Sequence, residues 1–438
     1  MTQSSQTISA HADEPSSSSV ASHTVQAKSL STSERAILEA ADLEALLAVI
    51  AETAEERETD HELPAAIYER LAAFGFTKRR VPKEHGGGGL DIEAFVEELV
   101  ALAAADTNVL QSLRTHILAT ERYVTSASSG DRDLWLGRIG AGAILGGAWT
   151  EAGDVTIGTF TTTLTRDGEG YRLNGRKFYS TGSLLADWLQ VTGVDEAGET
   201  AISIVPARAE GITHIDDWDG FGQQLTASGT TVFENVFVES ENLVPFGGTY
   251  DGSRGWQQLV LLAALVGAGE ALERIAIDLA RSPSHDDAEL DPVYLERLGW
   301  ISSRVFAARA GLREAARATQ RASESLLNAG AARTAPAVTE AIRLAERATF
   351  QAQVIIIDHV LAAANAVAEV SALGIATANP KAARAVERLW RNVRTIATHN
   401  PVLFKQRMIG DDLAFGIDSG APRERRHRRG EPAEGDRS

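Results

Sequence analysis

The chain has 438 residues, of which 44% are hydrophobic and 23% charged, the composition of a globular protein with a large core. It contains no cysteine, which excludes disulfides, thiolate metal ligands and cysteine nucleophiles. The formal net charge of −18 argues against a nucleic-acid partner, because phosphate binding needs a basic surface. No apolar run reaches the roughly 18 residues that a membrane span requires. We therefore expect neither a membrane partner nor a metal site.

The N-terminal third of the chain is predicted to be helical. Residues 1–30 are Ser-rich and lack the basic and apolar regions of a secretion signal, so we expect a disordered tail in a cytoplasmic protein. From residue 31 to residue 140, apolar residues recur at three- and four-residue spacing. After a glycine-rich loop, the pattern predicts helices at 92–105 and 108–126.

Near Ala141 the pattern changes to strands, and residues 141–248 are predicted to form a β-domain. In the run 171–179, the pair Asn174-Gly175 lies between alternating residues and predicts a β-hairpin turn. Further strands are expected at 159–165, 188–193, 201–205 and 229–238.

Residues 249–415 return to long helical periodicity, which predicts an antiparallel bundle. Its helices are expected at 256–280, 292–329, 335–373 and 380–399. Residues 416–438 include a compact basic run and are expected to form a disordered tail, with a nucleic-acid or membrane patch as the alternative.

Two runs of the predicted β-domain carry a resemblance. Lys177-Phe-Tyr-Ser-Thr-Gly-Ser183 and Gly222-Gln-Gln-Leu-Thr-Ala-Ser-Gly229 resemble the signature segments of the acyl-CoA dehydrogenase superfamily. The resemblance implies a mainly α fold with a β insert: an N-terminal helical domain, a central β-sandwich or barrel, and a C-terminal four-helix bundle. It also implies a flavin between the β-domain and the bundle, and a homotetramer.

The same resemblance implies a set of cofactor-binding residues. Short hydroxyl side chains and backbone N–H groups suit the flavin edge because they hold it without filling the substrate space. An arginine from a neighbouring subunit would pair with the phosphate, since its planar donors bind phosphate in bidentate fashion. The implied residues are Trp149, Thr150, Glu151, Tyr179, Thr181, Gly182, Ser183, Arg281, Thr377 and His399.

Departures from the dehydrogenase pattern indicate a different reaction. A dehydrogenase needs a carboxylate base to remove an acidic proton, but the expected glutamate is missing from the run Trp390–Pro401. The element that binds the adenosine half of FAD is reduced to Arg281-Ser-Pro-Ser-His285. We therefore expect FMN rather than FAD.

In both departures the chain resembles the two-component flavin-dependent monooxygenases of this superfamily, typified by dibenzothiophene monooxygenase. That resemblance implies that a separate NAD(P)H:flavin reductase supplies FMNH2, which reacts with O2 to give a flavin C4a-hydroperoxide. One oxygen atom then passes to a small apolar organic substrate, expected at sulfur or nitrogen, as in organosulfur metabolism.

Three residues are the predicted catalytic groups. His399 would face the peroxy group, His116 would line the opposite side, and Ser183 would hold flavin N5. The alternatives are structural: His399 as a helix cap, His116 as an interior histidine, and Arg281 as a helix-end cation. Two other functions stay open, namely an FAD-dependent acyl-CoA dehydrogenase whose base is Glu270, and a non-catalytic scaffold of the same fold.

Overall fold

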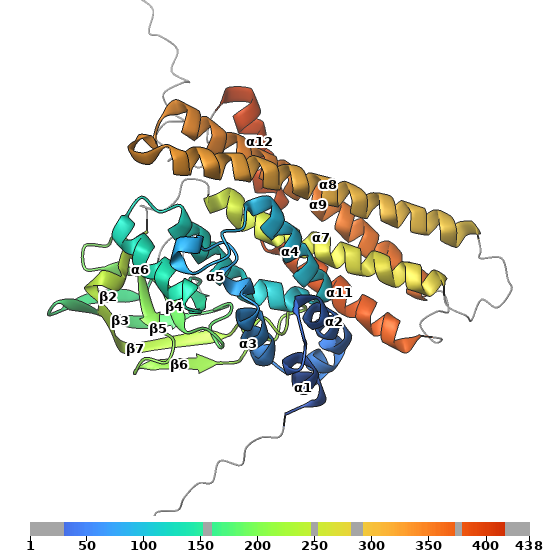
Figure 1. The fold of residues 1–438 in the computed structure, drawn as a ribbon, viewed down its shortest axis with the longest axis horizontal. Helices are drawn as coiled ribbons and strands as arrows, with labels where there is room; N and C mark the ends of the chain where they lie inside the picture. Colours follow the sequence, from blue (N-terminus) through green and yellow to red (C-terminus); the bar gives the residue numbers. More distant parts are fainter. Residues whose placement is uncertain (1–29, 152–159, 247–252, 282–291, 373–378, 417–438) are drawn as a thin grey trace, which may run out of the picture.

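The computed structural model describes residues 30–151, 160–246, 253–281, 292–372 and 379–416. The two predicted tails, apart from residues 30 and 416, and the predicted cofactor residue Thr377 lie outside these ranges. Figure 1 shows helices, then a sheet domain, then long helices in chain order. This arrangement confirms the predicted acyl-CoA dehydrogenase-like fold class.

Six helices precede the sheet. They are α1 Thr32–Leu38, α2 Leu43–Thr59, α3 Ala65–Ala73, α4 Ile92–Ala105, α5 Thr107–Val124 and α6 Ser129–Gly140. Most of these helices begin at a residue whose side-chain oxygen accepts a hydrogen bond from the first helical turn. At α5, the capping residue Asp106 also forms a buried ion pair with Arg57 of α2, at 2.7 Å. The cap therefore fixes the start of α5 against its neighbour.

The sheet has eight strands in two antiparallel blocks. The strands are β1 Leu145–Ala148, β2 Thr163–Asp167, β3 Gly170–Lys177, β4 Trp188–Asp195, β5 Thr200–Pro206, β6 Ile212–Ile215, β7 Thr230–Glu239 and β8 Leu243–Pro245. One block has the order β6-β7-β3-β2, and the other has β4-β5-β8. A short parallel pairing of β2 with β4 joins them, and β1 pairs with the preceding stretch of the same edge of β4.

The predicted turn at Asn174-Gly175 is wrong. Both residues lie inside the continuous strand β3, at a bulge where the register with β7 shifts. The Asn174 side chain accepts a hydrogen bond from Asn235 N, and a Cβ on Gly175 would lie 2.4 Å from Thr162 Oγ1. The real turn joins β2 to β3 at residues 168–169, where Gly168 has φ +59°.

The long helices form the C-terminal part. They are α7 Ser253–Ala280, α8 Pro292–Asn328, α9 Pro336–Ala372 and α11 Pro380–Thr398, followed by the shorter α12 Val402–Phe415. Helix α9 packs against all four of the others. Its stretch Pro336–Val370 is apolar and long enough to cross a membrane, but half of its most apolar window is buried inside the protein. The apolar composition of α9 therefore serves the bundle core.

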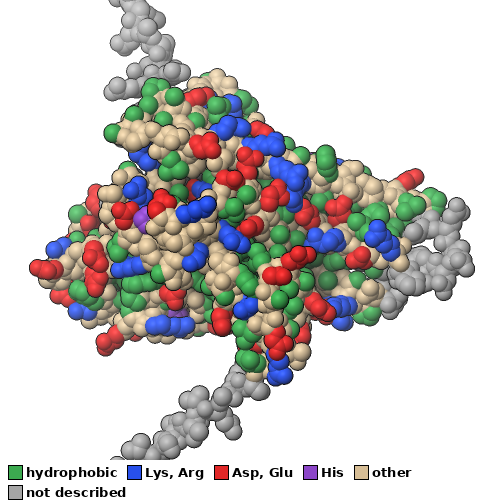
Figure 2. Space-filling view, in the orientation of Figure 1, with side chains coloured by type: hydrophobic (Ala, Val, Ile, Leu, Met, Phe, Trp, Pro, Cys, Tyr) green, Lys and Arg blue, Asp and Glu red, His purple; other side chains and the backbone are tan. Residues whose placement is uncertain are grey.

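The N-terminal helices and the bundle share one hydrophobic core, whereas the sheet has its own. Helix α7 contacts α4 and α5, and α8 contacts α4. On the face in Figure 2, acidic and basic side chains are interspersed, and ion pairs such as Arg313–Glu97 and Arg317–Glu93 connect α8 to α4. Helix α5 lies between the sheet and the bundle, touching β1, α7 and α11.

Candidate functional site

The two predicted cofactor segments are neighbours in space although about thirty residues separate them. Phe178 N donates to Thr150 O at 2.8 Å, and Gly147 N donates to Thr181 O at 3.2 Å. These backbone bonds hold the segment around residue 150 beside the run 177–183.

Both segments press closely on helix α5. Gly182 has φ +74°, and a Cβ there would lie 2.4 Å from Ser112 O. A Cβ on Gly147 would lie 2.7 Å from Trp149 Nε1 and 2.8 Å from Thr115 Oγ1. Glycine is therefore required at both positions, because the backbone approaches the helix too closely for a side chain.

Ser183, the residue predicted to hold flavin N5, carries a buried hydroxyl. Its Oγ has no hydrogen-bond partner among the described residues, and the same holds for the buried Oγ of Ser180. Buried polar atoms without partners are rare in folded proteins because their desolvation is uncompensated. Two such hydroxyls beside the close-packed Gly182 are chemically suited to a planar heterocycle with polar edges, such as an isoalloxazine.

Glu151 has a different environment from the one expected for a cofactor contact. Its carboxylate accepts hydrogen bonds from the backbone and hydroxyl of Thr161 and Thr162, and from Lys177 Nζ at 2.6 Å. Although burial raises the pKa of Glu151, these hydrogen bonds lower it to about 2. The Glu151 side chain is thus fully used in holding the segment in place, which leaves only its backbone for a cofactor.

The aromatic residues of the site differ in exposure. Tyr179 is 58% exposed, adopts φ +54°, and makes an edge contact with Trp218 at a ring separation of 5.4 Å. Trp149 is half-buried and lies near Phe246. A left-handed backbone at a large aromatic residue is strained, and such strain concentrates at functional sites.

His399 follows the last turn of α11 and faces α5. Its Nε2 lies 3.2 Å from an Nη of Arg114, and a guanidinium can only donate, so Nε2 accepts. The ring keeps solvent-exposed surface but is packed among enough protein that desolvation, followed by the charge of Arg114, lowers the pKa of His399 to about 4. His399 is therefore neutral at physiological pH, with its remaining proton on Nδ1.

Helix α5 connects these groups. Ser112 touches the Gly182 loop, Arg114 touches His399, and Thr115 touches the Gly147 strand. Three residues of α-helix rise only about 4.5 Å. The predicted N5 segment and His399 therefore meet the same helical turn from different sides.

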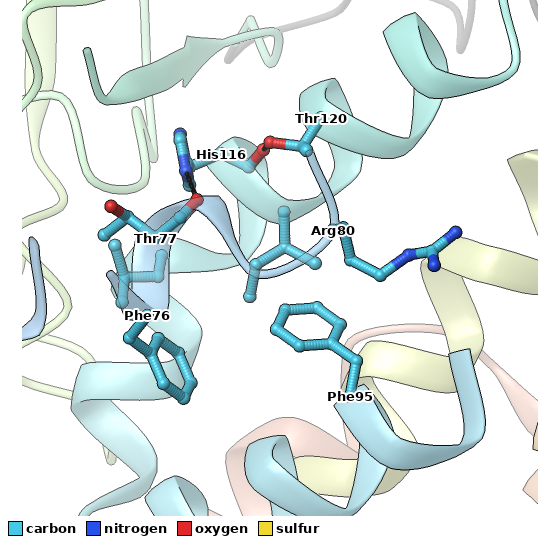
Figure 3. A pocket seen from close by; sticks show the side chains of 8 residues that line it. Phe76, Thr77, Arg80, Phe95, His116 and Thr120 are labelled. Carbon is cyan, nitrogen blue, oxygen red and sulfur yellow. Dashed lines mark hydrogen bonds between the residues drawn. The ribbon is translucent and has the colours of Figure 1, made fainter. Parts of the chain in front are cut away.

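His116, by contrast, is held by backbone groups on both ring nitrogens. Nε2 lies 2.6 Å from Thr77 O, and Nδ1 accepts from Leu145 N at 3.3 Å. Figure 3 shows the ring directed at Thr77 beside a small cavity that Phe76 and Phe95 also line. That cavity encloses about 10 Å³, enough for one water. These contacts favour the structural alternative for His116.

Arg281 and Glu270 lie away from this turn of α5. Arg281 is exposed just after α7, whose C-terminal end lies at the tip of the bundle remote from the sheet in Figure 1. Contact with a flavin phosphate would therefore need a second copy of the chain. Glu270 forms an ion pair with Arg309 of α8, which also pairs with Glu97 of α4. That carboxylate is engaged between helices.

The run 222–229 is anchored to both helical parts. Asn392 of α11 accepts from Gln223 N at 2.7 Å and donates to Thr107 Oγ1 of α5 at 3.0 Å. Gln223 Nε2 donates to the same hydroxyl at 2.9 Å. Leu184 N and Gly182 N in turn donate to carbonyls of the run. We name Thr107, Gln223 and Asn392 the polar latch.

Comparison with known families agrees with the fold and the signature segments. The model "Acyl-CoA dehydrogenase, N-terminal domain" matches residues 32–143, and "Acyl-CoA dehydrogenase, middle domain" matches residues 148–236. Residues 32–143 and 148–236 thus carry the N-terminal and middle domains of the acyl-CoA dehydrogenase superfamily. The matched middle domain contains both predicted cofactor segments.

Relatives within the superfamily include monooxygenases. Dibenzothiophene monooxygenase of Rhodococcus erythropolis is 26% identical over 396 residues, covering 83% of this chain and 90% of the relative. Amino sugar nitrososynthase DnmZ of Streptomyces peucetius is 29% identical over 301 residues, covering 64% and 72%. FMN-bound TdsC from Paenibacillus sp. A11-2 has a similar fold, with a TM-score of 0.74 at 23% identity, covering 88% and 98%.

Two features of the site were absent from the sequence-based prediction. Arg114 looks like an ordinary solvated helix charge in the sequence, because the same stretch carries other polar and charged residues such as Gln111 and Arg122. The polar latch joins residues more than 100 positions apart, and no local pattern predicts such a contact.

Proposed function

We propose that this chain is an FMN-dependent monooxygenase, and that a separate NAD(P)H:flavin reductase supplies the reduced flavin. The observation that carries the proposal is a neutral imidazole, His399, that contacts the same turn of α5 as the segment with the buried hydroxyls, from another side of the helix. The relatives named monooxygenases and the FMN-bound neighbour support it.

The chemistry requires each of these residues in a particular form. Reduced FMN supplies the activation of O2, and in the overall reaction FMNH2, O2 and a thioether give FMN, a sulfoxide and water. Ser183 offers an uncommitted hydroxyl to the flavin edge. Neutral His399 offers its Nδ1–H group as a hydrogen-bond donor during oxygen transfer. Because the ring is neutral, it carries no additional proton that it could release to the flavin.

A sulfur or nitrogen atom is the proposed oxygen acceptor. A lone pair on sulfur or nitrogen can take an electrophilic oxygen without loss of a carbon-bound proton, and so without a strong base. Glu270, the carboxylate considered for that role, is engaged with Arg309. One relative is named for a sulfur heterocycle and another for an amino sugar, and we favour sulfur.

A phosphate site shared between subunits completes the proposal. Arg281 lies at the remote end of α7, so we propose that it binds the FMN phosphate of a neighbouring copy in a homotetramer. Crosslinking or light scattering of the FMN-loaded protein would measure the assembly.

The test begins with cofactor binding. FMN at about 100 times its Kd should raise the free energy of unfolding by about 2.7 kcal/mol, and FAD should do so only at higher concentration. Protein mixed with photoreduced FMN, O2 and a panel of thioethers and amines should then yield products that carry one added oxygen, measured by mass spectrometry.

Two results would overturn the assignment. Tight FAD binding, together with flavin reduction by an acyl-CoA thioester that depends on Glu270, would indicate a dehydrogenase. No binding of any flavin at micromolar concentration would indicate a scaffold.

A further inference from the structure

Arg114 is an inward-facing arginine that has no carboxylate partner among the described residues and contacts the predicted catalytic His399. Its only hydrogen bond among the described residues goes to His399, and its Nε is buried without a partner. Burial lowers the pKa of Arg114 to about 10, with no carboxylate to offset it. The guanidinium is charged at neutral pH but uncompensated.

Several buried arginines elsewhere in the protein are paired with a carboxylate. Buried Arg57 pairs with Asp106 at 2.7 Å, Arg80 pairs with Glu121 at 2.9 Å, and Arg391 pairs with Glu58. A desolvated cation without a counter-ion is costly, because the charge loses water and gains no opposite charge. An arginine that stays in this state at a candidate active site therefore has a role that a packing residue would not need.

The place of Arg114 indicates the ligand. It lies between Ser112, which contacts the predicted flavin segment, and Thr115, and it touches the exposed ring of His399. A group that reaches His399 from solvent would therefore meet the guanidinium too. The Nε and the remaining Nη donors suit the parallel oxygens of a carboxylate or sulfonate.

We propose that Arg114 binds an oxyanion on the substrate, so that the enzyme oxidises sulfur or nitrogen compounds that also carry a carboxylate, sulfonate or similar group. The proposal rests on the proposed function and narrows its substrate class, from the apolar compounds expected from sequence to anionic ones. The anion would supply the missing counter-charge and direct the acceptor atom toward His399.

The experiment compares two thioethers that differ in one charge. Binding of (phenylthio)acetate and of its uncharged methyl ester is measured by calorimetry on the full-length, FMN-loaded protein. The acid should bind at least about tenfold more tightly than the ester, since hydrogen bonds between charged groups are strong. In Arg114→Gln this ratio should fall to near one, and Arg114→Lys should keep part of it.

Arg122→Gln provides the matched control. Arg122 lies on the same helix two turns later, is also desolvated with a lowered pKa, and donates to Gln190 rather than to the site. This variant should keep the full preference for the acid. Circular dichroism melting of each variant separates lost binding from lost folding.

Several outcomes overturn the proposal. Equal binding of acid and ester, binding of neither at millimolar concentration, or an acid preference that survives in folded Arg114→Gln would each do so. If Arg114→Gln instead weakens FMN binding and leaves the acid-to-ester ratio unchanged, the arginine serves the flavin.

The same protein distinguishes this inference from the proposed function. Binding of the acid that depends on Arg114, without sulfoxide formation from reduced FMN and O2, would support the anion site and contradict the monooxygenase assignment. Sulfoxide formation from the ester as readily as from the acid would support the monooxygenase assignment and contradict the anion site.

Discussion

The protonation state of His399 is set by its surroundings, and it has a measurable consequence. Desolvation and the positive charge of Arg114 lower the pKa of His399 to about 4, against an ordinary value of 6.5. The neutral ring that we assign to catalysis should then persist well into the acid range. For a neutral thioether, we expect the acid limb of kcat/KM near pH 4 rather than near pH 6.5.

Two variants check the origin of that limb. His399→Gln should reduce oxygenation at pH 7 by about 10² to 10⁴-fold, the usual contribution of a proton donor or acceptor, while FMN binding is kept. Arg114→Gln should move the acid limb upward, because it removes the repelling charge. A limb that stays near pH 6.5 in the wild type would show that the imidazole lies in bulk-like solvent.

The buried ion pair between Glu151 and Lys177 contributes to the stability of the folded chain. The two side chains are 4% and 0% exposed, and Glu151→Gln would leave the Lys177 ammonium buried without a counter-charge. Removing one partner of such a pair costs about 3–5 kcal/mol. Urea unfolding at pH 7 should detect this loss.

The pH dependence of the same pair follows from the lowered pKa of Glu151. Below its unfolded value of 4.5, the unfolded chain takes up a proton that the folded carboxylate, with a pKa of about 2, does not. The stabilisation is therefore present above pH 4.5 and is lost as pH falls from 4.5 toward 2. Glu151→Gln should lack this component, so the two stability curves should converge in acid.

At the scale of elements, the loop 178–187 must lie directly against α5. Gly182→Ala places a Cβ 2.4 Å from Ser112 O at φ +74°, so the loop must move away from the helix. We expect a loss of about 1–3 kcal/mol and weaker FMN binding. Gly168→Ala is the control: φ is +59°, but nothing lies within 4 Å of the new Cβ. Equal effects of both variants on FMN affinity would refute a role for the close contact.

Helices were predictable from sequence where periodicity and caps coincide. The prediction 92–105 coincides with α4, whose Asp91 cap and apolar stripe both mark its limits. The prediction of a hairpin at Asn174-Gly175 failed because Asn-Gly also suits a bulge. The hydrogen bond from Asn235 N to Asn174 and the packing of Gly175 on Thr162 favour the bulge over the turn. The nearby Asp167-Gly168 pair carries the real turn.

The candidate site could be predicted only in part. Its signature segments are contiguous runs, so a resemblance locates Ser183 and Gly182 in the sequence. The partner of His399 could not be found this way, because Arg114 is 285 positions distant and its meaning depends on burial without a carboxylate. Long-range charge balance is a property of the folded chain.

At the scale of the whole molecule, the polar latch joins the sheet domain to both helical parts. Asn392→Ala removes the acceptor of Gln223 N and a donor to Thr107 in a fully buried place. We expect a loss of about 1–3 kcal/mol, because a buried N–H then lacks a partner. Since the run 222–229 also supports the Gly182 loop, FMN affinity should fall together with stability.

Asn365→Ala separates the latch from a general effect of losing an asparagine hydrogen bond. Asn365 of α9 also accepts a hydrogen bond, from Trp390 Nε1 at 2.8 Å, but it is exposed. This variant should change stability by less than about 0.5 kcal/mol and leave FMN affinity intact. If Asn392→Ala lowers stability without weakening FMN binding, the latch stabilises the domain contact but does not position the flavin segment.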